Sequence, residues 1–152
     1  MQNRRQTLKQ SALVAGLLAA TGLFPQYAMA FNKAAFDAKN LNDALKALGA
    51  TGAPQASTSV TLTAPDIAEN GAVVPLAVAS TLPNVKQILL LVEKNPSALV
   101  AVFNVTPEVE PNFATRAKMG ESSDVYAVAI TADGKAHYAK KDVKVTLGGC
   151  GG

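Results

Sequence analysis

The residue best suited to chemistry in this sequence is Cys150, the only cysteine and the third residue from the end. Two glycines precede it, Gly148 and Gly149, and two follow it, Gly151 and Gly152. Glycine adopts positive and negative φ angles about equally, so this tail is predicted to be a slim, flexible arm. Five extended residues span at most roughly 17 Å. The thiol can therefore enter a narrow site on another molecule.

The neighbouring sequence is not expected to activate this thiol. The terminal carboxylate is close, and a negative charge disfavours the thiolate, so it is expected to raise the pKa of Cys150. An ordinary thiol, with a pKa near about 8.5, is only a few per cent thiolate at neutral pH. We therefore expect this chain to present the thiol and a partner to activate it.

A single cysteine near the end of a chain can also have roles other than that of a carrier arm. An odd cysteine in an exported protein can form an intermolecular disulfide, so an interaction module that dimerises through Cys150 remains an alternative. An expression scar is disfavoured, because the tail continues a strand pattern. A prenylation box needs the cysteine in the fourth position from the end, and Cys150 is in the third.

The rest of the chain has few residues that could form a catalytic or cofactor-binding site. His137 is the only histidine, so His and Cys ligands cannot assemble a metal site, and no cofactor is expected. His137 lies two residues after Lys135, on the same face of the expected strand, and is predicted to face solvent. A flexible glycine arm cannot hold Cys150 beside this imidazole as a catalytic pair. The sequence also lacks a P-loop, a nucleophile elbow and a G-x-G-x-x-G motif, so we predict that the protein is not an enzyme.

Residues 1–30 have the pattern of a twin-arginine signal peptide. Arg4 and Arg5 precede an apolar segment, and an A-x-A cleavage site ends at Ala30. The apolar segment is shorter than the about 20 residues that cross a bilayer. The sequence therefore predicts removal of the leader, a mature chain that begins at Phe31, a periplasmic location and no membrane attachment after removal.

Composition bounds the kind of protein and its partners. The chain has 152 residues, of which 49% are hydrophobic and 16% charged, as expected for one globular domain. The formal net charge is +3, but three basic residues lie in the leader. The remaining chain has eleven basic and eleven acidic residues, so it lacks the basic surface that nucleic-acid binding requires.

The mature chain is predicted to be an antiparallel β-sandwich preceded by a helix. Residues 31–57 are expected to form one helix that stops at Gly49, followed by a linker. Residues 58–147 contain about seven short strands with turn signals about every 10 residues. Pro75 predicts an edge or a bulge, the apolar run Ile88–Val92 predicts a central strand, and Asp133-Gly134 predicts a hairpin.

Four lysines precede the arm: Lys135, Lys140, Lys141 and Lys144. They could attract anionic ligands or acidic partners. The simpler interpretation, which we favour, is that they protect an exposed strand edge.

Several stretches of the sequence are similar to the SoxY family of sulfur carriers in the Sox sulfur-oxidation system. They are Val143–Gly152, Ala64–Pro75, Leu91–Pro96 and Lys118–Val125. The tail carries the most specific part of this resemblance. Thr7 in the leader, where a Phe is commoner, is a small departure.

The resemblance implies an immunoglobulin-like fold and a role as a carrier. Cys150 would be the covalent attachment site for sulfur, and the four arm glycines would give it reach and access. The implied partners are a SoxZ-type subunit in a heterodimer, a c-type haem enzyme that conjugates thiosulfate, a hydrolase that releases sulfate, and a sulfane dehydrogenase. A ubiquitin-like carrier also ends in Gly-Gly, but its activation needs ATP. The twin-arginine leader would remove this chain from the cytoplasm, where ATP is found.

Overall fold

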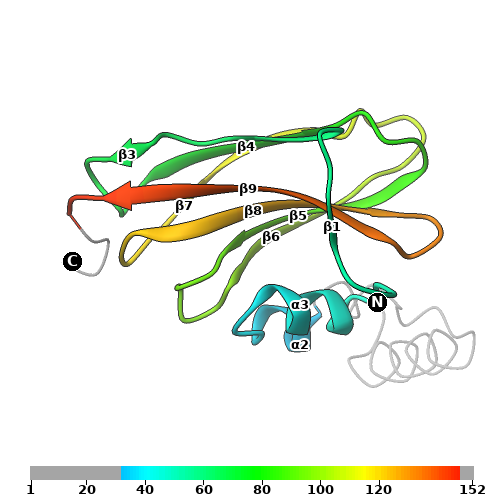
Figure 1. The fold of residues 1–152 in the computed structure, drawn as a ribbon, viewed down its shortest axis with the longest axis horizontal. Helices are drawn as coiled ribbons and strands as arrows, with labels where there is room; N and C mark the ends of the chain where they lie inside the picture. The colour runs from blue at the N-terminus through cyan, green and yellow to red at the C-terminus, as the bar shows by residue number, and fades with distance from the viewer. Residues whose placement is uncertain (1–31, 148–152) are drawn as a thin grey trace, which may run out of the picture. The chain divides into compact units, whose positions relative to one another are not determined.

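The computed structural model describes residues 32–147, so the predicted leader and the arm Gly148–Gly152 lie outside the described residues. Residues 32–147 form two stacked β-sheets, with two short helices against the larger sheet (Figure 1). The helices are α2 (Lys33–Phe36) and α3 (Leu41–Ala47). The strands are β1 (Gln55–Ala56), β2 (Val60–Thr63), β3 (Ile67–Ala68), β4 (Val74–Ser80), β5 (Val85–Val92), β6 (Leu99–Asn104), β7 (Asn112–Ala117), β8 (Ser123–Thr131) and β9 (Ala136–Val145).

The two sheets have simple strand orders. The larger sheet runs β1-β9-β8-β5-β6, with β3 also paired to β9, and the smaller sheet runs β2-β4-β7. The long strands pair antiparallel, and only the two-residue strands β1 and β3 pair parallel, both with β9. Seven strands have four or more residues, which confirms the predicted sandwich and its approximate strand number.

The apolar run in β5 is buried on both faces, which explains why it does not alternate with polar residues. Ile88, Leu90 and Val92 face the smaller sheet, whereas Leu89 and Leu91 face the helices. All five are at most 1% exposed. β5 has β8 on one side and β6 on the other, so the prediction of a central strand is confirmed.

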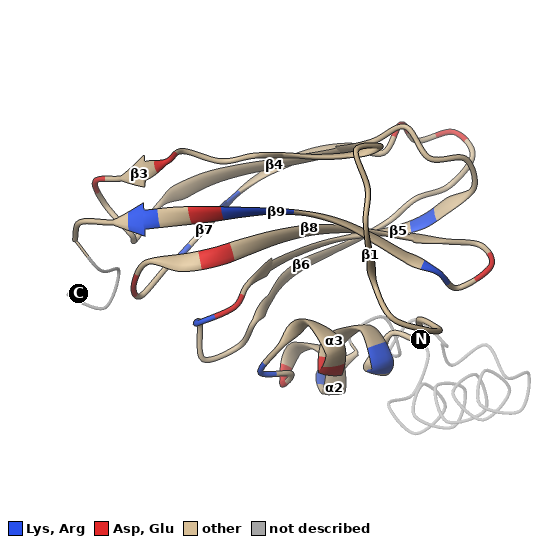
Figure 2. Cartoon of the chain, viewed as in Figure 1, with Lys and Arg blue, Asp and Glu red and all other residues tan. Residues whose placement is uncertain are grey.

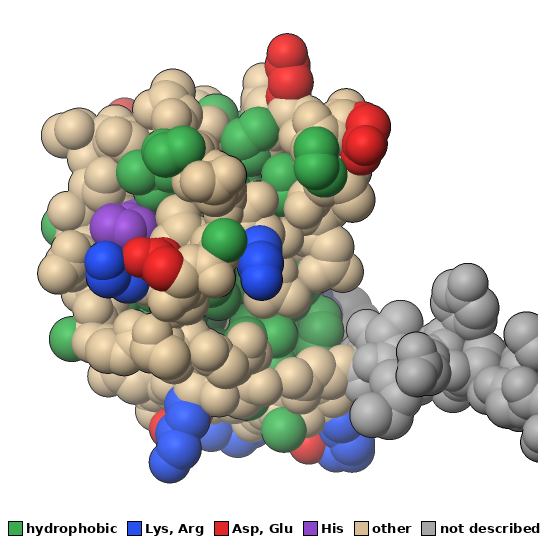
Figure 3. Space-filling view, turned by 90° about the vertical axis from the view of Figure 1, so that its right-hand side faces the viewer, with side chains coloured by type: hydrophobic (Ala, Val, Ile, Leu, Met, Phe, Trp, Pro, Cys, Tyr) green, Lys and Arg blue, Asp and Glu red, His purple; other side chains and the backbone are tan. Residues whose placement is uncertain are grey.

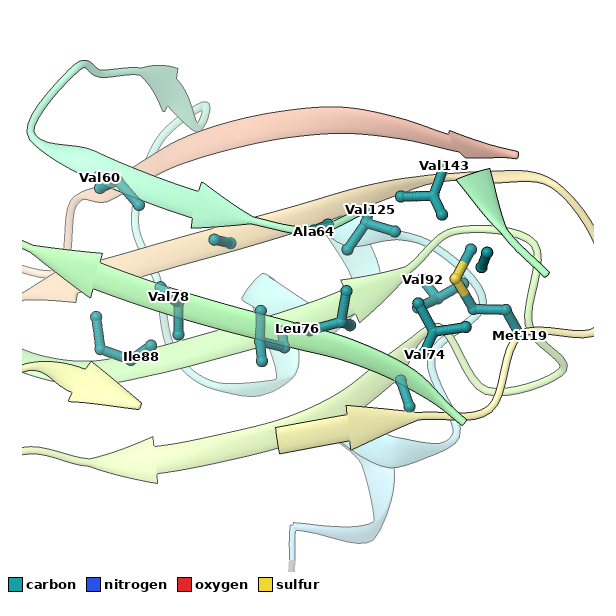
Figure 4. Close-up of a cluster of buried hydrophobic side chains, with 14 of the residues drawn as sticks. Val60, Ala64, Val74, Leu76, Val78, Ile88, Val92, Met119, Val125 and Val143 are labelled. Carbon is teal, nitrogen blue, oxygen red and sulfur yellow. The ribbon is translucent and has the colours of Figure 1, made fainter. Parts of the chain in front are cut away.

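The space between the sheets is filled by side chains from both (Figure 4). Val74, Leu76 and Val78 project inward from β4, because alternate residues of a strand point to the same face. Met119, just after β7, is fully buried in the same cluster. Burial of each such side chain stabilises the fold by about 1.5–3 kcal/mol before entropy is counted.

The prediction of one helix up to Gly49 was wrong, because two short helices take its place. Each begins at an asparagine whose side chain caps it: Asn32 accepts a hydrogen bond from the Ala35 amide, and Asn40 accepts one from the Asp43 amide. Asn40 has extended backbone angles, which end any continuous helix there. The predicted stop is confirmed, since Gly49 has a φ of 77°.

Two other segments differ from the sequence prediction. The predicted linker contains β1, which pairs with β9 at His137 and Tyr138. The last strand is longer than the short strands that the sequence predicts, since β9 runs without a break through Lys140, Lys141 and Asp142 and pairs with β8 from Ala136 to Val143. These charged residues remain in the strand because their side chains form ion pairs.

Pro75 lies in the middle strand of the smaller sheet, but at a position where only one neighbour remains. It pairs with Arg116 of β7. The β2 partner of β4 extends only as far as Ala77, opposite Thr63. Pro75, which has no N–H to donate, therefore lies where β4 is locally an edge of the sheet, as predicted. Within residues 32–147, no helix is long and apolar enough to span a membrane.

Candidate functional site at the root of the C-terminal arm

The predicted site residues Cys150, Gly148, Gly149, Gly151 and Gly152 lie outside the described residues. The described part of the site is the root of the arm, the segment that leads out of β9 to Leu147 (Figure 1). The hydrogen bonds of this root show how far along the chain the body of the protein extends.

One side of the root is bound by the segment that contains β3. The Lys144 amide donates to the Asp66 carbonyl at 2.9 Å, and the Thr146 amide donates to the Ala68 carbonyl at 3.1 Å. The Thr146 hydroxyl also donates to the Glu69 carbonyl at 3.0 Å. Lys144 near the end of β9 and Thr146 just after it are thus bound to a segment about 77 residues earlier in the chain.

Two further hydrogen bonds hold the last described residues. The Gly71 amide donates to the carbonyl of Leu147 at 2.7 Å. From the opposite side, the Val145 amide donates to the Ser122 hydroxyl at 2.9 Å. Val143, two residues before Val145, is fully buried in the core. These hydrogen bonds fix the root on the body up to Leu147, the last described residue.

The four lysines before the arm each lie within ion-pair distance of a carboxylate. Most of these partners are on nearby strands or turns, as Figure 2 shows for the charges along β8 and β9. The pairs are Lys135–Asp133 at 3.0 Å, Lys140–Asp124 at 2.9 Å, Lys141–Asp66 at 3.0 Å and Lys144–Asp142 at 2.6 Å. With their charges balanced in this way, they fit a solvated strand edge better than an anion-binding site.

The pKa shifts of Tyr126 on β8 and Lys140 on β9 have local causes and do not mark a catalytic group. Partial burial, followed by the charge of Glu93, raises the pKa of the Tyr126 hydroxyl. The hydrogen bond to Asp124 raises the pKa of Lys140. Lys140 also lies 5.8 Å from the centre of the Tyr126 ring. These groups favour their ordinary protonation states at neutral pH, so they offer neither a general base nor an activated nucleophile.

His137 lies at the far end of β9 from the arm. It is partly buried, opposite Ala129 of β8 and Gln55 of β1, rather than fully open to solvent as the strand parity suggested. Ten residues of extended chain separate it from Leu147, roughly 30 Å. Cys150 is only three residues beyond Leu147, a reach of about 11 Å. Covalent geometry therefore keeps the thiol away from the imidazole of its own chain.

Sequence reasoning missed the residues that fix the root. Ser122 gave no signal, because its partner Val145 is 23 residues away in sequence. The hydrogen bond from the Gly71 amide to the Leu147 carbonyl likewise depends on the tertiary fold. In the part of the chain that the structure describes, no three His, Cys, Asp or Glu side chains gather as a metal-binding group.

The fold and the C-terminal arm define a class of protein: an immunoglobulin-like β-sandwich that carries a lone thiol on a glycine tail. The model of the family described as "Sulfur oxidation protein SoxY" matches residues 45–150. The chain therefore belongs to the SoxY family. Comparison with curated proteins gives no match.

Two solved structures are similar to this chain. The sulfur carrier protein SoxY from Chlorobium limicola f thiosulfatophilum is 36% identical, with a TM-score of 0.64, over 71% of this chain and 97% of that one. The superoxide reductase (neelaredoxin) from Ignicoccus hospitalis is 19% identical, with a TM-score of 0.51, over 57% of this chain and 80% of that one. At that low identity the second likeness concerns the fold alone.

Proposed function

We propose that this protein carries sulfur intermediates covalently on Cys150 during periplasmic oxidation of thiosulfate or sulfide. The observation that carries the proposal is the family match over residues 45–150, which includes Cys150 as its last residue. The similar chain from Chlorobium limicola is a sulfur carrier, and its likeness here covers nearly its whole length. The fixed root at Leu147 supports the same role, since a carrier arm needs a firm point of attachment on the body.

The chemistry assigned to Cys150 is conjugation followed by hydrolysis. The thiol loses its proton and joins the outer sulfur of thiosulfate, and the two electrons released pass to a c-type haem enzyme. Water then cleaves the bond to the sulfonate group, which releases sulfate and two protons and leaves a persulfide anion on the arm. A sulfane dehydrogenase oxidises the outer sulfur to a sulfonate, with oxygen from three waters and six electrons passed to a haem electron acceptor. A second hydrolysis releases this sulfonate as sulfate and restores the Cys150 thiol.

In this scheme the chain is a substrate for its partners and not an enzyme. It pairs with a SoxZ-type subunit, and the twin-arginine leader delivers it to the periplasm and is then removed after Ala30. The twin-arginine route exports proteins that have already folded, which suits a heterodimer formed before export, and the balanced charge of the mature sequence also supports a partner. Gel filtration of native periplasmic material tests this pairing, and a monomer as the only species would count against it.

Replacement of the thiol tests the carrier proposal. Cys150→Ser should abolish formation of the thiosulfate conjugate, because serine lacks the sulfur that forms the disulfide-type bond. The fold should be unchanged, because the arm lies beyond the buried residues of β9. The measurement is the intact mass after incubation with thiosulfate and the haem enzyme. A sulfur adduct on the serine variant would show that another residue carries the sulfur.

A further inference from the structure

The turn before β4 contains the only Asn-Gly pair of the sequence, Asn70-Gly71. An asparagine in such a pair can lose its side-chain amide, because the backbone nitrogen of the next residue attacks the side-chain carbonyl carbon. Glycine favours this attack, since it has no Cβ to obstruct the reacting atoms and its backbone is the most flexible. Every other asparagine within residues 32–147 precedes a residue that carries a side chain. Asn70 is therefore the asparagine in this part of the chain that is chemically most prone to deamidation.

The nucleophile of this reaction, the Gly71 nitrogen, is held by the root of the arm. The Gly71 amide donates to the Leu147 carbonyl at 2.7 Å, and Gly71 is buried. The Gly71 carbonyl accepts a hydrogen bond from the amide of the buried residue Met119, also at 2.7 Å. The nitrogen can attack only after it gives up the proton that it donates to Leu147. The closed root therefore opposes the reaction.

The electrophile, the carboxamide of Asn70, is held by its own turn. Asn70 is exposed, and its Oδ1 accepts a hydrogen bond from the Ala72 amide at 2.8 Å. Its backbone carbonyl accepts a second bond from the Val73 amide at 3.4 Å. The first bond is an Asx turn, which restricts the side chain relative to the backbone. Attack requires the carboxamide to turn its carbon toward the Gly71 nitrogen, so this bond opposes the reaction as well.

Water is the only other reactant that the modification needs. The Gly71 nitrogen bonds to the side-chain carbon of Asn70 and loses its proton, and the side-chain nitrogen leaves as ammonia. Water then opens the resulting succinimide ring at either of its two carbonyls, which gives aspartate or isoaspartate. No electrons are exchanged. In isoaspartate the main chain runs through the former side chain and is longer by one carbon, about 1.5 Å.

This extra carbon changes the attachment of the root. A shift of about 1.5 Å at the Gly71 nitrogen cannot be combined with a bond of 2.7 Å to Leu147 while Met119 keeps its own bond to the Gly71 carbonyl. The new carboxylate also places a negative charge beside that of Glu69. A chain that has reacted at Asn70 therefore keeps a looser root.

We propose that Asn70 is a deamidation site under the control of the root: it is protected while Leu147 holds the Gly71 amide and reacts when Leu147 is released. Any event that pulls the root off the body advances the modification. The fraction of isoaspartate at this position then records how often the root has opened. The proposal does not depend on sulfur chemistry at Cys150, so its failure would leave the carrier function as it stands.

The test is the rate of deamidation of the full mature protein in mildly alkaline buffer, measured by chromatography and mass spectrometry of the peptide that contains Asn70. The folded protein should react about thirtyfold more slowly than the protein unfolded in urea, because two hydrogen bonds must open first. Asn70→Gln should remove the signal, since glutamine would have to close a larger ring. This variant confirms that the signal comes from Asn70.

A loosened root should speed the reaction in the folded protein. Thr146→Val keeps the shape of the side chain and removes the hydroxyl that donates to the Glu69 carbonyl at 3.0 Å. We expect deamidation of the folded variant to be roughly fivefold faster, and that of the unfolded variant to be unchanged. Ser122→Ala, which removes the acceptor of the Val145 amide, loosens the root in a second way and serves if Thr146→Val fails to fold.

Thr131→Val is the matched control at the other end of the sandwich. It removes a hydroxyl that donates to the Lys135 carbonyl at 3.1 Å. Figure 3 faces this end, where acidic, basic and hydrophobic side chains are mixed. The control should leave the rate at Asn70 unchanged, because the root is intact. An equal acceleration would show that the reaction follows unfolding of the whole domain, and control by the root would be wrong.

The remaining outcomes are also decisive. Equal rates in the folded and unfolded protein would overturn the protection of Asn70. Wild-type rates in both root variants would overturn the control by Leu147. If the amide persists even in urea, Asn70 is not a deamidation site.

Discussion

At the scale of single residues, the glycines beside Cys150 are predicted to control access to partner active sites. Gly149→Val and Gly151→Val should leave the rate of alkylation by iodoacetamide unchanged. They should slow conjugation by the haem enzyme several-fold, because a β-branched side chain stiffens and thickens the arm. Alanine at the same positions adds only a methyl group and should have a smaller effect. Wild-type turnover by the valine variants would contradict the access argument.

Ser122 is a residue whose role only the fold reveals. Its hydroxyl accepts a hydrogen bond from the Val145 amide at 2.9 Å, so Ser122→Ala removes one of the contacts that fix the root. Loss of such a bond costs about 1 kcal/mol, so exchange of the Val145 amide with solvent should be roughly fivefold faster. Hydrogen exchange measured by NMR checks this, and Ser122→Thr, which keeps a hydroxyl, is the control. An unchanged exchange rate would show that the bond does not hold the root.

At the scale of elements, strands were predictable where local pattern and tertiary packing agree. The apolar run Ile88–Val92 predicted a central strand because burial on both faces leaves no polar position. The short strands β1 and β3 were not predictable, because each exists only through pairing with β9, far along the chain. The break at Asn40 was available in the sequence, since Asn followed three residues later by Asp is a helix-start signal.

The β8–β9 hairpin contains a carboxylate whose charge favours the folded state. Asp133 accepts hydrogen bonds from the Thr131 hydroxyl at 2.5 Å and the Lys135 amide at 3.3 Å. The Thr131 bond, followed by the contacts with Lys135, lowers the pKa of Asp133 well below its usual 3.8. The stabilisation is therefore fully present above pH 3.8 and is lost as the pH falls through the lower pKa of the folded state.

Asp133→Asn should remove this dependence on pH. We expect the difference in unfolding free energy between wild type and variant to be constant from neutral pH to about 5, and to shrink below the usual pKa of an aspartate. Urea denaturation at a series of pH values measures it. Thr131→Ser keeps the hydroxyl and should behave as the wild type does. A difference that stays constant throughout the acid range would contradict the assignment.

At the scale of the whole molecule, the sequence predicted the sandwich and the family, and the structure adds how the layers are used. The helices cover the outer face of the larger sheet, so Leu89 and Leu91 are buried there. Hydrophobic pattern alone does not say which layer covers which face. The same holds for Ile67: only the pairing of β3 with β9 places it beside Lys144, close to the root of the arm.

The carrier assignment is tested most directly by the mass of the protein as cells make it. The mature chain should be purified from periplasm of thiosulfate-oxidising cells without a reducing agent, and its intact mass and C-terminal peptide measured. We expect sulfur-bearing adducts on the peptide that contains Cys150, and their removal by treatment with a thiol reductant. An unmodified thiol throughout active oxidation, or only a disulfide-linked dimer, would contradict it and favour an interaction module that dimerises through this cysteine.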